Sequence, residues 1–328
     1  MIELREHSLI FSYPEVHEKA TLEIEFQRTL RIPDDGDNYP LPPGLGCFPL
    51  EHVDDYAQEV SREWIKRGGV MLPMYQSEAL WLNFTTLDGY PFAVKIATGK
   101  VDAITGKPWR DGLRHKKQNY LVAPEHPWLD GYCVEKGFIR QFVAMPLGSG
   151  YSAEEQITGE AEHGGLQICV YPLKAKAYRP FSYREGPACY SLVEKSAPAM
   201  GLAPGGRMRQ EIYKDPYRLK DWDVKHKSRC FVHITNSLVW RTITGKNPPT
   251  VPLTAQEYTR AGLPWFEFYA AEAKALEGSD PLAALKSVAQ MGQEKGDVPL
   301  PENVPVDPIN IIQLRKGLRK DQVREGEF

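Results

Sequence analysis

Glycine and proline interrupt this chain more densely than in an average globular protein, with 27 residues of each type among 328. Together they make up about 16% of the chain, against an average of about 12%. Because glycine and proline end regular secondary structure, such a high frequency favours short segments and many turns over long helices. The spacing of these two residue types therefore predicts a strand-rich fold.

The segments between the breakers carry the two-residue alternation of half-buried strands. In residues 20–27, Leu22, Ile24 and Phe26 alternate with polar residues, which gives one apolar and one polar face. Such a strand suits an antiparallel sheet that is wet on one side. Residues 230–240 form a second strong strand pattern, rich in β-branched and aromatic residues.

Helical patterns are confined to two places. Residues 53–67 carry an apolar stripe at helical spacing and end at a glycine pair, which predicts one N-terminal helix. Residues 254–292 predict a cluster of helices, which begin at a capping box from Thr254 to Glu257, at Pro264 and at Ser279. The fold class is therefore expected to be α+β and mainly antiparallel β, sandwich-like, with one N-terminal helix and a C-terminal helical cluster.

The domain organisation has two open alternatives. In the first, residues 1–200 form a β-rich region, residues 201–292 continue the sheet and add the helices 254–292, and residues 293–328 form an extended tail. The glycine- and proline-rich residues 198–208 are then the internal boundary. In the second, the chain is one single compact domain, which its length also allows.

Charge and hydropathy exclude several classes of protein. The net charge of −3 and the pI of about 6.3 argue against a nucleic-acid partner, which usually requires a basic excess. The sequence has no run of 18 apolar residues, so it predicts no membrane-spanning helix. The first residues carry charges where a signal peptide needs an apolar core, so we expect a soluble, cytoplasmic protein. Five scattered cysteines, an odd number without a CxxC pair, fit buried thiols in a reducing compartment.

The strongest candidate for chemistry is the polar segment inside residues 127–172, because two apolar runs flank it. If residues 160–163 are extended, Glu160 and Glu162 point the same way beside His163. Carboxylates and an imidazole suit general acid–base work or a divalent metal, and Asp130 could join them if the fold brings it close. The alternative is a charged hairpin loop whose glycines only make turns.

Two further segments are candidates for ligand binding. Trp128 precedes an Asp-Gly turn and could stack on a ligand, although a buried tryptophan before a turn explains the same pattern. Residues 201–209 combine glycines with Arg207 and Arg209, a composition that can bind an anion. The segment lacks the ending of a nucleotide-binding loop and leads into a strand pattern.

Four segments together carry a resemblance: PWLDG, IRQFVAMPLG, QITGEAEHGGLQI and GGRMRQEIYKDP. With them, the chain resembles a family of uncharacterised conserved proteins of bacteria and fungi, over about residues 76–300. The resemblance implies a shared fold. It implies no activity, cofactor or site residue.

Three functions remain open from the sequence. A non-catalytic binding or assembly protein is favoured, in which the proline-rich tail could mediate self-association. The alternative is a metal-assisted hydrolase that uses Glu160, Glu162 and His163 with a divalent metal. The third is a carbohydrate binder that uses Trp109 or Trp128 as a stacking surface.

Overall fold

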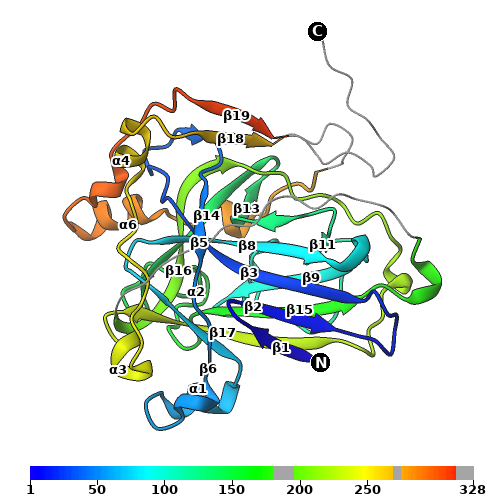
Figure 1. The fold of residues 1–328 in the computed structure, drawn as a ribbon. Helices are drawn as coiled ribbons and strands as arrows, with labels where there is room; N and C mark the ends of the chain where they lie inside the picture. Colours follow the sequence, from blue (N-terminus) through cyan, green and yellow to red (C-terminus); the bar gives the residue numbers. More distant parts are fainter. Residues whose placement is uncertain (180–195, 269–274, 315–328) are drawn as a thin grey trace.

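The computed structural model describes residues 1–179, 196–268 and 275–314, and Figure 1 shows their arrangement. The strands are β1 (Ile2–Arg5), β2 (Ser8–Ser12), β3 (Thr21–Thr29), β4 (Asn38–Tyr39), β5 (Gly44–Cys47), β6 (Glu51–His52), β7 (Val70–Met74), β8 (Ala79–Thr86), β9 (Phe92–Thr98), β10 (Val101–Asp102), β11 (Leu121–Ala123), β12 (Trp128–Leu129), β13 (Gly131–Glu135), β14 (Phe138–Pro146), β15 (Leu166–Pro172), β16 (Ser196–Arg209), β17 (Ser228–Ser237), β18 (Trp265–Phe268) and β19 (Ile311–Leu314). The α-helices are α1 (Arg62–Arg67), α2 (Ala153–Thr158), α3 (Trp240–Thr244), α4 (Ala255–Arg260), α5 (Asp280–Ala283) and α6 (Val288–Lys295). Short 3-10 turns occupy Asp54–Tyr56, Leu87–Gly89, Ala175–Ala177, Leu219–Asp221 and Pro301–Asn303.

The strands form two sheets that one long strand connects. The first sheet runs in the order β1, β2, β3, β8, β14, β16 and β4, with β5 beside β3, β12 beside β8 and β13 beside β14. The second runs in the order β6, β7, β17, β15 and β9, with β10 and β11 on the far side of β9. β16 belongs to both, because its first residues pair with β17 and its remainder pairs with β14. Most pairs are antiparallel; the pairs of β4 with β16, β7 with β17 and β18 with β19 are parallel.

The core lies between the two sheets. Leu22, Ile24 and Phe26 of β3 are fully buried in one apolar cluster with Ile96 of β9 and Ile168 of β15. The alternation expected for residues 20–27 is confirmed, since Leu22, Ile24 and Phe26 are buried and Glu23 and Glu25 are only partly buried. In Figure 1, α1 and α3 lie at the lower end of the molecule, and α4 lies beside β18 and β19 at the upper end. The expected α+β, mainly antiparallel, sandwich-like fold is therefore confirmed.

The N-terminal helix is shorter than the predicted residues 53–67. Asp54–Tyr56 forms a 3-10 turn, and α1 begins only after Ser61, whose side chain accepts a hydrogen bond from the Trp64 amide. The reason is local, because a serine that caps the amides of the following turn starts a new helix at that point. The apolar stripe is real, but it spans two separate turns that pack on Val53.

The middle of the predicted C-terminal helical cluster is a strand. Trp265–Phe268 forms β18, although Pro264 suggested a helix start there. Phe266 donates its amide to the Leu41 carbonyl and accepts the Leu41 amide, at 2.9 and 2.7 Å. The aromatic residues favour this extended pairing, and β19 pairs with β18 along its other edge. The remainder of the predicted helix, residues 269–274, lies outside the described residues.

The expected boundary and tail also have a defined structure. Residues 198–208 lie within β16, so the proposed division at residue 200 falls in the strand that joins both sheets. In the segment expected as an extended tail, α6 continues to Lys295, and β19 pairs with β18. The described tail also packs on the molecule through Arg31, which donates a hydrogen bond to Asn303 at 2.6 Å. The domain division and self-association through the tail stay predictions, and residues 315–328 lie outside the described part.

Candidate functional site

The acidic and histidine segment lies on the turn between α2 and β15. Residues 152–158 are a capped helix instead of the predicted polar loop: Ser152 and Glu155 cap each other reciprocally. Glu160 and Glu162 are exposed on the turn that follows, and the side chain of His163 is 14% exposed. His163 Nε2 lies 3.5 Å from a Glu162 carboxylate oxygen. The structure therefore brings Glu162 and His163 together.

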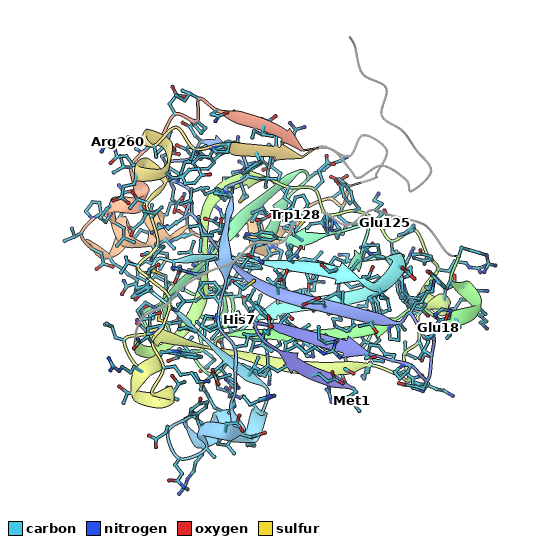
Figure 2. The ribbon with its side chains drawn as sticks, viewed as in Figure 1. Met1, His7, Glu18, Glu125, Trp128 and Arg260 are labelled. Carbon is cyan, nitrogen blue, oxygen red and sulfur yellow. The ribbon has the colours of Figure 1, made fainter. Side chains whose placement is uncertain are left out.

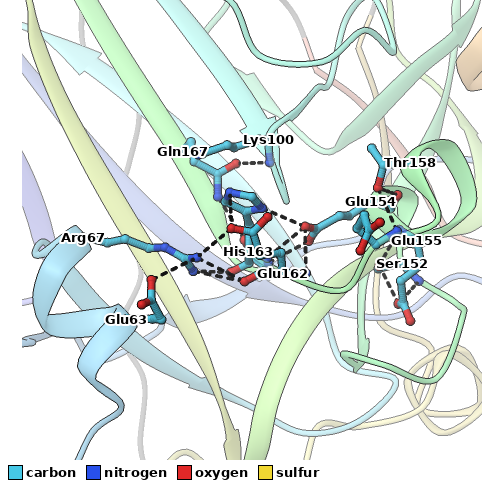
Figure 3. A network of polar contacts seen from close by, with 12 residues as sticks. Glu63, Arg67, Lys100, Ser152, Glu154, Glu155, Thr158, Glu162, His163 and Gln167 are labelled. Carbon is cyan, nitrogen blue, oxygen red and sulfur yellow. Dashed lines mark hydrogen bonds and ion pairs between the residues drawn. The ribbon is translucent and has the colours of Figure 1, made fainter.

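The buried carboxylate of this segment is Glu154, which belongs to the same sequence-selected group as Glu160, Glu162 and His163. Its oxygens accept hydrogen bonds from the amides of Glu162, His163 and Gly164 at 3.1, 2.9 and 2.8 Å. One oxygen also lies 3.0 Å from His163 Nδ1, and Figure 3 shows these contacts. Glu154 thus uses its acceptor capacity to fix the turn. The capping pattern of residues 152–155 could have indicated a helix that carries this residue.

Arg67 closes the other side of the network in Figure 3. Its guanidinium donates to the Glu162 carbonyl at 3.2 Å and lies 3.7 Å from the Glu162 carboxylate. Within residues 1–179, 196–268 and 275–314, no group of three or more His, Cys, Asp or Glu side chains is arranged to hold a metal ion. Because Arg67 and Glu154 bind the same turn, this network is well suited to hold the loop in place.

A shallow, solvent-open depression lies around Trp128, at the edge of the first sheet. Its cavity volume is about 20 Å³, and it is lined by Leu41, His126, Pro127, Trp128, Arg209, Gln210, Glu211 and Tyr213. Trp128 and Arg209, two residues singled out from the sequence, meet in it. Trp128 lies below β18 in the view of Figure 2 and packs on the apolar cluster that contains Trp265.

Asp130, two residues after Trp128, is buried. The Gln210 amide donates a hydrogen bond to its carboxyl group at 2.7 Å. Gln210 also accepts the Asp130 backbone amide at 3.1 Å. Burial raises the pKa of Asp130 to about 7, and the interactions with the Trp128 and Gln210 side chains oppose that shift. Asp130 is therefore a positioning group for Trp128 and Gln210.

His126 fixes the opposite wall of the depression. Its Nε2 accepts the Tyr213 backbone amide at 2.8 Å, and the two rings lie 4.8 Å apart. Burial lowers the pKa of His126 to about 4, so the ring is neutral near pH 7. Sequence reasoning missed His126, Gln210 and Tyr213. His126 lies two residues before Trp128, and Gln210 and Tyr213 follow Arg209 by one and four residues. Only the pairing of distant strands shows that these two segments meet.

Arg207 is positioned differently from Arg209. It donates a hydrogen bond to Glu135 at 2.5 Å, and its guanidinium lies 4.5 Å from the centre of the Phe138 ring. It is not among the residues that line the depression. Of the two arginines expected to bind a ligand, only Arg209 borders the hollow.

Comparison of the chain with family models, curated proteins and solved structures finds no match in any of the three. The resemblance to an uncharacterised family of bacteria and fungi therefore stays a prediction. In the part of the chain that the structure describes, every helix is too short or too polar to cross a membrane.

Proposed function

We propose that this chain is a non-catalytic binding protein whose ligand occupies the depression around Trp128. The observation that supports this is that the Trp128 side chain packs on the apolar cluster that contains Trp265 and also borders a hollow open to solvent, with the buried Asp130 carboxyl group beside it. A ring that is already held in place loses little entropy when a ligand stacks on it. This arrangement therefore favours a ligand that stacks on the Trp128 ring.

A saccharide is the ligand class that suits these walls best. The depression combines the aromatic rings of Trp128 and Tyr213 with the polar groups of Arg209, Gln210 and Glu211. Apolar faces with a few polar groups are typical of small-molecule sites, and a pyranose offers both an apolar face and hydroxyl groups.

The buried titratable groups support binding over catalysis. Asp130 and His126 both have shifted pKa values, which is a common feature of active sites. Each is nevertheless buried and hydrogen-bonded within the wall, at 3% exposure. They shape the depression, and a general acid or base would need to reach the bound molecule.

The metal-assisted hydrolase has weaker support. Its proposed ligands Glu160 and Glu162 are exposed, and His163 is bonded to Glu154. Metal analysis of the purified protein tests it directly, with Glu162→Gln and His163→Ala as comparison variants. A stoichiometric metal that both variants lose would favour the metal-assisted hydrolase over the proposed binding protein.

A reducing, intracellular compartment is part of the proposal. Among the described residues, Cys47, Cys133, Cys169 and Cys230 are buried and form no disulfide. Persistent buried thiols suit a reducing environment. Fractionation of the cells that make the protein would test the location.

The binding proposal is tested by titration calorimetry with three neutral probes: cellotetraose, chitotetraose and xylotetraose. We expect at least one to bind, and Trp128→Ala to weaken that binding about tenfold or more, since base or sugar stacking on an aromatic ring contributes about 1–3 kcal/mol. Trp128→Phe keeps a ring and should retain part of the affinity. Absence of binding for all three, or equal binding by Trp128→Ala, would remove the saccharide reading.

A further inference from the structure

A strongly basic loop lies beside the second sheet and shares no residue with the lining of the Trp128 depression. It comprises residues 107–117, between β10 and β11, and we call it the basic loop. Its five cationic residues are all exposed: Lys107, Arg110, Arg114, Lys116 and Lys117. Asp111 is its one anion, so the loop carries a net charge of +4 on a chain whose net charge is −3.

A buried lysine holds the basic loop in place. Lys95 of β9 is 0% exposed and donates hydrogen bonds to the carbonyls of Arg110 and Gly112 at 2.5 and 3.1 Å. Burial lowers the pKa of Lys95. Asn119, also buried, accepts the Arg114 amide at 2.8 Å. The loop is thus anchored at several backbone positions, and its cations are displayed from a fixed backbone.

Trp109 is held in the middle of this loop. The Lys95 ammonium lies 4.4 Å from the centre of its ring, a cation–π contact, and the indole donates to Asp111 at 3.4 Å. The Trp109 amide donates to the Lys100 carbonyl at 2.7 Å. The residue is partly exposed. The side chain also packs against the main apolar cluster, so the part of the ring that stays exposed is the part that a partner can reach.

Neighbouring strand β17 extends the positive surface. Lys227 and Arg229 both pair with Asp111, at 3.4 and 3.5 Å. One carboxylate thus faces two cations. Burial raises the pKa of Asp111, but the combined attraction of Lys227 and Arg229 outweighs burial and leaves this pKa below its ordinary value. The local excess of positive charge remains.

We propose that the basic loop binds an acidic polysaccharide, with Trp109 stacked on a sugar ring and the surrounding cations paired with uronate carboxylates. A fixed indole suits the apolar face of a pyranose, and arginine pairs well with carboxylates. The basic loop offers one aromatic ring, whereas single-stranded nucleic acids use series of rings for successive bases. Its Leu113 is buried, so the loop exposes no leucine that could enter a bilayer beside Trp109.

This proposal does not depend on the Trp128 depression. The two sites share no residue, and their probes differ in charge. A failure of one therefore leaves the other standing.

The charge of the loop is tested with hexagalacturonate by titration calorimetry at low ionic strength. We expect the triple variant Arg114→Gln, Lys116→Gln and Lys117→Gln to weaken binding about tenfold or more, because charge pairing at exposed sites is additive but modest. A control triple variant removes three exposed cations elsewhere, Arg62, Lys66 and Arg260, each to Gln, and should change binding less than about threefold. Equal losses in both variants, or no binding by the unaltered protein, would overturn the proposal.

The ring and the identity of the polymer need separate measurements. Trp109→Ala should weaken hexagalacturonate binding about tenfold, and Trp109→Phe should restore much of it. Circular dichroism of both variants shows whether the fold is kept. A six-residue oligothymidylate of similar charge serves as the comparison probe. Tighter binding of the oligothymidylate would reject the polysaccharide in favour of a nucleic acid, and unchanged binding by Trp109→Ala would reject the stacking.

Discussion

Asp130 is the buried acid whose replacement tests the description of the Trp128 depression most directly. Burial raises its pKa to about 7, from an ordinary value of 3.8. The folded protein therefore binds the Asp130 proton more tightly than the unfolded chain does. Its contribution to stability is complete at low pH and is lost as the pH rises from about 4 through about 7.

The expected size of this loss follows from the two pKa values. Between about pH 5 and about pH 7, the Asp130 carboxyl group is ionised in the unfolded chain, whereas the folded protein keeps it protonated. This interval of about two pH units corresponds to a loss of about 3 kcal/mol in the free energy of unfolding. Asp130→Asn cannot ionise, so it lacks this loss. It also lacks one acceptor for the Gln210 donor, but that cost is the same at every pH.

Comparison with the unaltered protein is essential, because other buried groups titrate in the same range. Burial raises the pKa of Asp102 to about 6, which has the same sign as Asp130. Burial lowers the pKa of His126 and of His233 to about 4, so their contributions are lost as the pH falls. These opposing effects largely cancel in the total stability.

The assay is urea unfolding followed by circular dichroism at about pH 5 and about pH 8. We expect the stability of Asp130→Asn, relative to the unaltered protein, to rise by about 3 kcal/mol between the two conditions. Asp55→Asn, which alters an exposed carboxylate, should show no such rise. A rise below about 1 kcal/mol would mean that Asp130 is not the buried, proton-retaining group described.

Three further variants test other buried polar groups. Arg28→Met should cost about 3–5 kcal/mol in urea unfolding because it leaves Glu78 buried without its partner at 2.7 Å; the double variant with Glu78→Leu should recover most of that loss, and no recovery would contradict the pairing. Glu154→Gln should cost about 1–3 kcal/mol and speed hydrogen exchange of the amides of residues 162–164; unchanged exchange would contradict its anchoring role. His233→Phe keeps a ring between its two stacked neighbours and should reduce, by about 3 kcal/mol, the stability lost between about pH 7 and about pH 4; an unaltered acid loss would show that His233 does not carry it.

The sequence by itself determined the class of fold and the position of several strands. Alternation at Leu22, Ile24 and Phe26 has one physical cause, because successive side chains of a strand point to opposite faces. The β-branched and aromatic composition of residues 230–240 likewise indicated a strand, and β17 contains residues 230–237. Capping patterns were also local, and the one at Thr254 correctly marked the start of α4.

Only the tertiary structure decided where the chemistry-bearing groups meet. Residues 265–268 could be helix or strand by their own composition, and the hydrogen bonds to Leu41 and β19 selected the strand. Gln210 reaches Asp130 because β14 pairs with both β13 and β16. Lys95 of β9 reaches Arg110 of the basic loop because β10, which precedes the loop, pairs with β9. Local patterns specify the direction of a side chain, whereas the partner that it meets depends on which distant strands lie side by side.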